Sequence, residues 1–374
     1  MTRVLIAGVA TRGFAQSAVR AGYEVIAVDG FGDLDLRACA RAVVVARAGE
    51  RFSVRAALAA ARDLPRDAVS YVGSFENHPR AVAALAARGQ LWGNAPAVLR
   101  RVRDPARLAR GLASRGFAVP AVRRAAPGDS RGRWLVKPRA SGGGSGVARW
   151  RGGGIPRGSY LQAHLPGVPG SIVFAANGRR AVPLGVSHAL AGERRFGAAG
   201  FRYCGSILAP AGSRHLAHAT RLSAAVTELF GLVGVNGLDF VTVDGTPQAI
   251  EVNPRYTASM ELVERAHGLS IFGIHARACA GELPDFDLAG SHLPGVFGKA
   301  VVYARRDVMP EHTHHWLDDA DLGDVPPSGE WIARGRPICT IFARARTVAG
   351  CHAALARRAR ALYHTLEGRR VRIA

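Results

Sequence analysis

Apolar and polar residues alternate along the first 100 residues in an order that predicts a parallel sheet with crossover helices. Short apolar runs, typical of buried strands, lead into segments with helical spacing of apolar residues. The strand-like runs lie at 4–9, 24–28, 42–45 and 69–72, and the helical segments lie at 14–20, 54–62 and 81–88. Because strands alternate with helices, we expect an N-terminal parallel α/β unit over residues 1–100.

A helical stretch follows from residue 94 to residue 120. It begins twice at N-cap signals, first at Asn94, which precedes an Ala-Pro pair, and then at Asp104, which precedes a proline. A glycine-rich and mostly β segment then runs to about residue 170. We therefore expect a small unit rich in turns between this helical stretch and the rest of the chain.

The second half of the chain predicts one long helix and a hairpin. Apolar residues recur at helical spacing over 213–230, and two strand-like runs at 235–243 and 248–252 flank Asp244-Gly245, a dipeptide typical of tight hairpin turns. The last 80 residues contain a turn-rich segment at 324–329, a strand at 338–342 and a basic helix at 348–366. We read residues 291–374 as a small C-terminal α+β extension.

The composition favours a folded protein that acts on small, charged molecules. The 374 residues are 48% hydrophobic, which suits two or three packed units. The formal charge of +22 suggests nucleic acid, but residues 101–170 alone hold 14 basic and 2 acidic residues, a net charge of +12. That segment has neither interleaved aromatic residues nor a zinc-finger pattern. A polyphosphate or a multiply charged acid is therefore the better reading than a nucleic-acid partner.

The cysteines and the apolar runs point to a cytoplasmic protein. Five cysteines are scattered without a C-x-x-C pair, so neither a zinc site nor a disulfide framework is indicated, and a reducing compartment fits. The N-terminus shows no basic segment followed by a long apolar one, and no stretch reaches 18 uncharged apolar residues. We therefore expect no membrane partner.

Polar residues on the predicted hairpin form a candidate metal site. Glu251 and Asn253 are two residues apart on a strand, so they point to one face, and the hairpin brings Asp239 beside them. Two carboxylates and an amide are hard oxygen ligands suited to Mg²⁺. Arg255 adds a cation next to this set. The alternative is an ordinary polar sheet edge, but the residues between them are apolar, which favours a functional site.

A lysine followed by a glycine run forms a candidate phosphate lid. Lys137 ends the apolar run 134–136, and residues 141–146 read Ser-Gly-Gly-Gly-Ser-Gly. A lysine at a strand end can place a charge on phosphates, while a glycine loop lets backbone N–H groups close over them. A flexible linker is the alternative for the glycine run. A short strand at 159–163 follows, where Gln162 could accept a hydrogen bond from the exocyclic amine of an adenine.

Candidate substrate contacts lie in the N-terminal unit. The first turn, residues 8–13, matches neither G-x-G-x-x-G nor a P-loop, so a nucleotide there is not favoured, but Arg12 lies near a helix N-terminus and could meet an anion. Glu76 and Asn77 follow the fourth apolar run, at the edge of the sheet where ligands usually sit. Helix capping is the alternative for these two residues.

The order of these parts resembles the ATP-grasp superfamily, which includes biotin carboxylase and D-alanine-D-alanine ligase. The resemblance covers residues 1–290, and it implies an α/β class fold with a pre-ATP-grasp domain at 1–100 and an ATP-grasp domain at 101–290. Within the latter, the lid would span about 118–170 and the metal-binding part about 171–290. The segments 4–8, 29–33, 73–79 and 201–205 further resemble predicted carboxylate-amine ligases related to tyramine-glutamate ligase, some of which make one-carbon carrier cofactors.

The resemblance assigns roles to single residues. It implies ATP contacts for Lys137, Ser141, Gly142, Gly143, Gly144, Ser145, Gln162, Ala163 and Leu165. It implies Mg²⁺ ligation by Asp239, Glu251 and Asn253, with Glu251 between two ions and Mn²⁺ as a substitute metal. It implies catalytic roles for Arg255 and Lys137. We expect substrate contacts for Arg12, Glu76, Asn77, Arg202 and Tyr203.

Two departures from the family pattern affect the nucleotide site. Asp104-Pro105 stands where many relatives have a helix lysine, so that phosphate contact is missing or passes to Arg101 or Arg107. The hinge also lacks a carboxylate for the ribose. The resemblance implies a ligase that forms an acyl phosphate from a carboxylate and couples it to an amine, usually as a homodimer. A carboxylase that activates bicarbonate and a non-catalytic ATP-binding protein are the alternatives.

Overall fold

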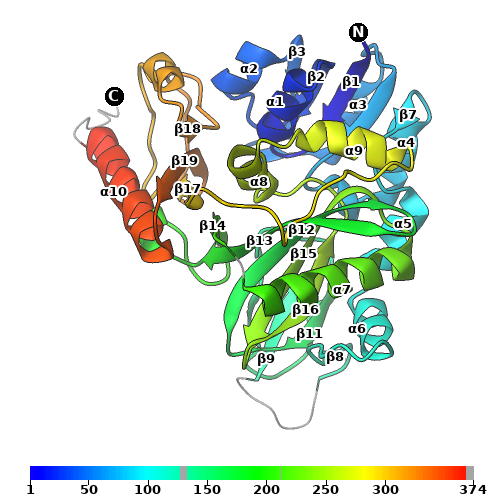
Figure 1. Cartoon of the computed structure of the whole chain (residues 1–374). Helices are drawn as coiled ribbons and strands as arrows, with labels where there is room; N and C mark the ends of the chain where they lie inside the picture. Colours follow the sequence, from blue (N-terminus) through cyan, green and yellow to red (C-terminus); the bar gives the residue numbers. More distant parts are fainter. Residues whose placement is uncertain (127–132, 211, 368–374) are drawn as a thin grey trace.

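Five strands of the N-terminal unit form a parallel sheet, as the alternation predicts. The computed structural model describes residues 1–126, 133–210 and 212–367, and the strand order in this sheet is β3-β2-β1-β6-β7 (Figure 1). The strands are β1 (Arg3–Ala7), β2 (Glu24–Asp29), β3 (Ala42–Val45), β6 (Ala68–Tyr71) and β7 (Gln90–Leu91). The helices are α1 (Arg12–Arg20), α2 (Leu34–Cys39), α3 (Val54–Ala61) and α4 (Pro79–Ala86), with the 3-10 turn η1 (Phe75–Asn77). A two-stranded hairpin, β4 (Arg47–Ala48) and β5 (Arg51–Phe52), follows β3.

One buried carboxylate shapes the carboxyl edge of this sheet. Asp29 ends β2 and accepts hydrogen bonds from the Thr11 backbone N–H at 2.7 Å and from the Thr11 hydroxyl at 2.8 Å. It also accepts from the backbone N–H groups of Phe31 at 2.6 Å and Gly32 at 2.8 Å. The turns after β1 and β2 are therefore held together without a bound ligand.

Two short helices, α5 (Pro96–Val102) and α6 (Pro105–Ala113), lead out of the N-terminal unit. Asp104 caps α6 as predicted, because its carboxylate accepts from the N–H groups of Ala106 and Arg107. The prediction for Asn94 is wrong: the N-cap of α5 is Ala95. The Asn94 side chain instead donates to Asn236 at 2.8 Å, and so ties this connection to the large sheet.

A small four-stranded sheet lies in the segment predicted to be the lid, and we keep the name lid for it. Its order is β10-β9-β11-β8, and residues 127–132 of the predicted lid lie outside the described residues. The strands are β8 (Val122–Arg123), β9 (Trp134–Pro138), β10 (Ala148–Arg149) and β11 (Ser159–Ala163). Trp134, Trp150 and Leu161 make its own small core, so the lid packs as a separate layer.

The largest sheet has eight antiparallel strands in the order β16-β15-β12-β13-β14-β17-β19-β18. Its strands are β12 (Val168–Asn177), β13 (Ala181–Ala191), β14 (Tyr203–Leu208), β15 (Val233–Val243), β16 (Thr246–Asn253), β17 (Val296–Tyr303), β18 (Leu322–Gly323) and β19 (Pro337–Ala345). The pairing of β14 with β17 continues the sheet across residue 290. The boundary predicted at residue 290, between the ATP-grasp domain and the C-terminal extension, therefore falls within one continuous sheet.

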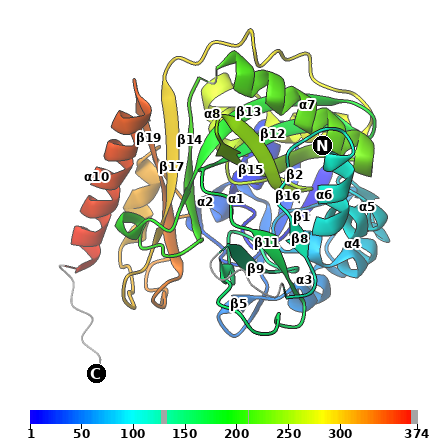
Figure 2. The ribbon, with the colours of Figure 1, turned by 90° about the horizontal axis from the view of Figure 1, so that it is seen from below.

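Helices cover this sheet and join it to the N-terminal unit. They are α7 (Ser213–Phe230), α8 (Met260–His267), α9 (Ile271–Cys279) and α10 (Val348–Glu367), with 3-10 turns η2 (Arg194–Phe196) and η3 (Thr313–Asp318). Figure 1 shows α8 and α9 between the N-terminal unit and the large sheet. One buried cluster contains Phe14 of α1, Phe272 of α9 and Val173 of β12, so both units share a core. Seen from below, α10 packs along the outer strands β17 and β19 (Figure 2).

The hairpin turn predicted at Asp244-Gly245 is confirmed. It joins β15 to β16, and both residues have positive φ, 48° and 73°. Such backbone angles belong to the tight turn whose twist matches that of the flanking strands. The turn thereby sets the register that brings the two strands' polar residues together.

Candidate active site

The three predicted metal ligands meet on the β15–β16 hairpin. Asp239 pairs directly with Glu251, and Gly237 pairs with Asn253. The Asn253 amide donates to a carboxylate oxygen of Asp239 at 2.9 Å. The three side chains therefore share one face of the hairpin. Two carboxylates and an amide oxygen at this position fit a hard cation such as Mg²⁺.

The two carboxylates have different electrostatic surroundings. Burial and the neighbouring charge of Glu251 raise the pKa of Asp239 to about 6. Burial also acts to raise the pKa of Glu251, but the charges of Arg103 and Lys137 outweigh it and hold that pKa below its usual value. A bound cation would relieve the repulsion between the two carboxylates, which supports the metal assignment of the site.

Lys137 lies at the end of β9 and is buried, with its ammonium group held by Gln162. The Lys137 Nζ donates to Gln162 Oε1 at 3.0 Å, and Gln162 Nε2 donates to the Ile250 carbonyl at 3.2 Å. Gln162 thus orients Lys137 towards the metal ligands. A contact of Gln162 with adenine stays a prediction, and its amide already has protein partners at both ends.

The glycine loop of the lid docks on the segment before β14. Tyr203 donates its backbone N–H to the Gly143 carbonyl at 3.0 Å. Gly144 has φ +73°, and a Cβ built there would lie 1.8 Å from the Phe201 carbonyl oxygen. A side chain is therefore excluded at Gly144 both by its backbone angle and by the close approach of the two loops.

A cavity of about 430 Å³ lies between the lid and the large sheet. Most of the predicted site residues line it, namely Lys137, Ser141, Gly142, Gly143, Gly144, Gln162, Ala163, Leu165, Tyr203, Asp239, Glu251, Asn253 and Arg255. Its lining does not include Arg12, Glu76, Asn77, Ser145 or Arg202. The structure therefore gathers the predicted metal residues and all predicted nucleotide residues except Ser145 in one place, and puts most predicted substrate contacts outside it.

Arg103 is a site residue that the sequence reasoning missed. It follows α5 and lines the cavity, whereas the lining includes neither Arg101 nor Arg107, the two arginines expected to replace the helix lysine. Arg103 forms a salt bridge with Glu251. The only signal for it in the sequence was its place in an arginine-rich helix end, which does not distinguish it from its neighbours.

The same arginine joins three parts of the molecule. Besides Glu251, its guanidinium donates to the Asn77 side chain at 2.9 Å and to the Ser141 carbonyl at 3.1 Å. Asn77 belongs to the N-terminal unit and Ser141 to the lid. Arg103 therefore connects the lid and the N-terminal unit to a metal ligand, and Asn77 acts through Arg103 in this structure.

Glu76 holds Arg255 in place. The Glu76 side chain is 1% exposed, and its Oε1 accepts from Arg255 Nε at 2.8 Å. Arg255 also donates to Asn253 Oδ1 at 3.2 Å and to the Tyr256 carbonyl at 2.9 Å. These contacts aim the guanidinium at the metal ligands. A buried Glu76 acts on the site by positioning Arg255.

Arg12 and Arg202, both predicted to contact substrate, are bound to protein groups. Arg12 is 2% exposed and forms salt bridges with Glu261 and, at 2.9 Å, with Asp324. Arg202 donates to the Gly335 carbonyl at 2.6 Å. Arg12 therefore joins the N-terminal unit to later segments of the chain, and its charge is already balanced. A substrate contact for either residue stays a prediction.

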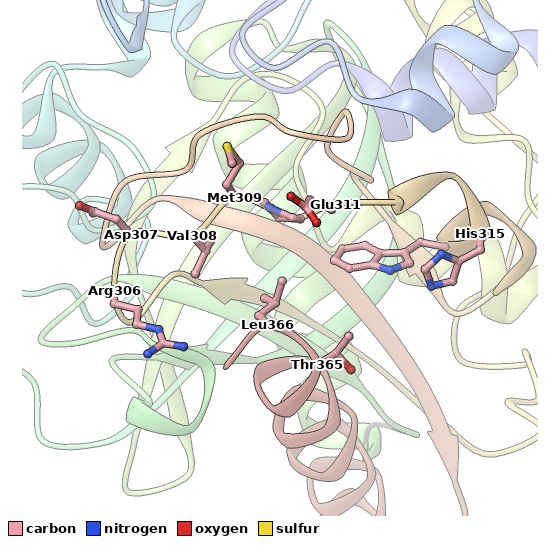
Figure 3. A pocket seen from close by; sticks show the side chains of 10 residues that line it. Arg306, Asp307, Val308, Met309, Glu311, His315, Thr365 and Leu366 are labelled. Atoms are coloured by element: carbon pink, nitrogen blue, oxygen red, sulfur yellow. The ribbon is translucent and has the colours of Figure 1, made fainter. Parts of the chain in front are cut away.

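A second cavity, of about 410 Å³, lies at the end of α10 (Figure 3). Its lining includes Arg306, Met309, Glu311, His315 and Leu366. None of the predicted site residues belongs to it. Within the described residues, no helix is long and apolar enough to cross a membrane.

Comparisons with known proteins bear on the fold. Residues 102–259 match the family model described as an ATP-grasp domain. A search of curated protein sequences finds no match. The fold resembles that of L-amino acid ligase from Bacillus licheniformis, with a TM-score of 0.71, 17% identity, and coverage of 96% of this chain and 97% of that one.

Carboxylases share the same fold. The biotin carboxylase domain of Hydrogenobacter thermophilus 2-oxoglutarate carboxylase, solved with MgADP, ADP and bicarbonate, matches with a TM-score of 0.72 and 14% identity, over 98% of this chain and 90% of that one. Rhizobium etli pyruvate carboxylase matches with a TM-score of 0.74 and 14% identity, over 96% of this chain, but the chain spans only 37% of that protein. At these identities the likeness establishes the fold alone.

Proposed function

We propose that the protein is an ATP-dependent carboxylate–amine ligase, in line with the match of residues 102–259 to the family model described as an ATP-grasp domain. The observation that carries the proposal is the convergence of Lys137, Arg103 and Arg255 with the oxygen set of Asp239, Glu251 and Asn253 around one cavity. Three fixed cations beside three oxygen ligands suit a nucleotide triphosphate held with a metal ion, and a nucleotide-binding protein without turnover has no need of the whole set.

The residues of the site have separate tasks in this reaction. Asp239, Glu251 and Asn253 would hold Mg²⁺, two ions with Glu251 between them, and Mn²⁺ as a substitute; the metal supplies charge neutralisation on the phosphates. Lys137 and the glycine loop bind the phosphates. Arg255, aimed by Glu76, faces the phosphoryl group in transfer and stabilises the negative charge that develops there.

Two chemical steps follow from this arrangement. A carboxylate oxygen of the first substrate attacks the γ-phosphorus of ATP, the bond to the β-phosphate oxygen breaks, and ADP leaves. The resulting acyl phosphate is attacked by an amine, which forms the amide and releases phosphate and a proton. Docking of the Gly143–Gly144 loop on the segment before β14 excludes water from the acyl phosphate.

The charge of the lid favours an acidic acyl substrate. Residues 101–170 carry a net charge of +12, and Arg103, Arg139 and Lys137 line the cavity itself. We propose glutamate or a polyglutamyl chain as the acyl donor, in the making of a one-carbon carrier cofactor. The enzyme would work in the cytoplasm and as a homodimer, the form in which the biotin carboxylase domain of Hydrogenobacter thermophilus 2-oxoglutarate carboxylase was solved. Light scattering would measure this oligomeric state.

Phosphate release from ATP and Mg²⁺ tests this function, with amino acids, polyglutamate and small amines as co-substrates. Wild-type protein is expected to release phosphate only with a carboxylate present, and Glu251→Gln and Lys137→Ala are expected to lose this activity. If Glu251→Gln turns over like the wild type, the metal assignment is wrong. If bicarbonate stimulates phosphate release and no other carboxylate does, the protein is a carboxylase. If ATP binds but no co-substrate stimulates phosphate release, the protein is a non-catalytic ATP-binding protein.

A further inference from the structure

Four arginines from three separate segments lie close together beside the main cavity. Arg47 and Arg51 belong to the β4–β5 hairpin, Arg202 precedes β14, and Arg336 precedes β19. We call these four residues the arginine cluster. Their segments come from the N-terminal unit, the central part and the C-terminal part of the chain, so only the tertiary structure brings them together.

Hydrogen bonds place these segments in contact. Arg336 Nη2 donates to the Glu50 carbonyl at 2.6 Å, and Glu50 directly precedes Arg51. Arg202 Nη1 donates to the Gly335 carbonyl at 2.6 Å, and Gly335 directly precedes Arg336. Two hydrogen bonds from arginine side chains to main-chain carbonyls thus join the hairpin, the loop before β14 and the loop before β19.

The charges of this region are not balanced. Arg47 pairs with Glu330 at 2.7 Å, but within the described residues neither Arg51 nor Arg336 has a carboxylate oxygen within 4 Å. Burial lowers the pKa of Arg336, and the charges of Arg47, Arg51 and Arg202 lower it further against the opposing charge of Glu50. Among the described residues, Arg47 is therefore the one member of the cluster with a carboxylate partner within 4 Å.

The cluster lies where a substrate can reach both it and the reaction centre. Phe201 and Tyr203, on either side of Arg202, line the main cavity together with Arg255. The β4–β5 hairpin follows the carboxyl end of β3, and Arg47 donates to the Gly30 carbonyl, just after β2. Ligands of open parallel sheets usually bind at this edge. Figure 2 shows β5 and the C-terminal loops on the same side of the molecule.

The exposure of the cluster suits a binding site better than a structural role. Arg51 is exposed, and Arg47, Arg202 and Arg336 are half-buried. Hydrogen bonds to carbonyl oxygens hold the guanidinium groups of these three half-buried arginines in place. Fixed guanidinium groups lose little conformational entropy on binding, and they match the planar geometry of carboxylates and phosphates.

We propose that the arginine cluster is a subsite for the anionic part of the substrate, a group with at least two negative charges. The inference rests on the proposed function, because it takes the neighbouring cavity to be the place of acyl transfer. An oligocarboxylate chain and a phosphate ester share the required chemistry. The carboxylate to be activated would lie near Arg255, and the remaining charges would extend past Arg202 to the cluster.

Direct binding tests this subsite without turnover. Calorimetry would measure the affinity of tri-glutamate and of glycerol 3-phosphate for the full-length protein saturated with MgADP. Arg51→Gln and Arg336→Gln each remove one charge from the cluster. The matched control is Arg55→Gln, which removes an exposed charge from α3 in the same unit.

One of the two probes is expected to bind, and its identity distinguishes an oligocarboxylate from a phosphate ester. Each cluster variant should weaken that probe about tenfold, as the loss of one charge-assisted contact does, and Arg55→Gln should leave it within twofold. Affinity should also fall as salt rises, because the contact is ionic.

Several results would overturn the subsite. The subsite is ruled out if neither probe binds the wild type, if the cluster variants bind as the wild type does, or if Arg55→Gln loses as much affinity as they do. The proposed function fails separately if no carboxylate stimulates phosphate release. That result would not change what calorimetry says about binding at the arginine cluster. A ligase whose KM for its acyl substrate is unchanged in both cluster variants would overturn the subsite alone.

Discussion

The contact of the lid with the segment before β14 predicts a large effect of a small substitution, Gly144→Ala. The new Cβ would lie 1.8 Å from the Phe201 carbonyl oxygen, whereas real Cβ contacts stay beyond 3.0 Å, so the two loops must separate by more than about 1 Å. The carbonyl belongs to the backbone and cannot turn aside as a flexible side chain can. The Gly144→Ala variant therefore cannot adopt the docked position of the lid.

A misplacement of this size near reacting groups can cost about 100-fold in rate, which corresponds to about 2.7 kcal/mol of activation free energy. The loop carries the phosphate contacts of the proposed reaction, so we expect kcat to fall by about this factor. Steady-state phosphate release would measure kcat and KM, and circular dichroism would confirm the fold.

Gly153→Ala is the control for backbone strain. Gly153 lies in the same lid at φ +81°, close to the +73° of Gly144, but a Cβ there meets nothing within 4 Å. Both alanines carry the strain of a left-handed residue, about 1–2 kcal/mol, and only one has the clash. An equal loss in both variants would attribute the effect to strain. A kcat within twofold of wild type in Gly144→Ala would refute the role of lid docking.

Three further predictions concern single buried or half-buried groups. Arg103→Ala should lower kcat/KM for ATP by about 10-fold or more, because one charge-assisted contact is lost. The control Arg107→Ala removes an exposed arginine and should leave kcat/KM unchanged. Equal effects of the two substitutions would contradict the placement of Arg103 in the site. Glu76→Gln keeps the shape of the side chain but removes the charge that aims Arg255, so kcat should fall about 10-fold with little change in the Kd of ADP; an altered Kd with normal kcat would speak against this positioning role. Burial lowers the pKa of His275 to about 4, so its neutral form stabilises the fold above pH 6.5, and about 3 kcal/mol is lost as pH falls from 6.5 to 4. The free energy of unfolding, measured by urea denaturation, should fall by this amount between pH 6.5 and 4. If it falls as steeply with pH in His275→Gln as in the wild type, the assignment to His275 is wrong.

The sequence alone determined the local parts of the site. A glycine run, a strand-ending lysine and a hairpin with alternating polar residues each act over a few residues, and their geometry follows from chain periodicity and turn chemistry. The Asp244-Gly245 turn is the best example, because it specifies the register that places Asp239 against Glu251. The parallel order of the first sheet and the bounds of α7, Ser213–Phe230, were likewise predictable.

The tertiary structure decided which of several similar charges belong to the site. In an arginine-rich chain, nothing local distinguishes Arg103 from Arg101, and only the tertiary structure sets Arg103 beside Glu251. Arg12 carries the expected charge, but later segments supply the carboxylates that neutralise it. Contacts between residues more than 100 positions apart depend on how whole units pack, and periodicity carries no information about that. The convergence of oxygen ligands could therefore be read from the sequence, whereas the cations that serve them could not.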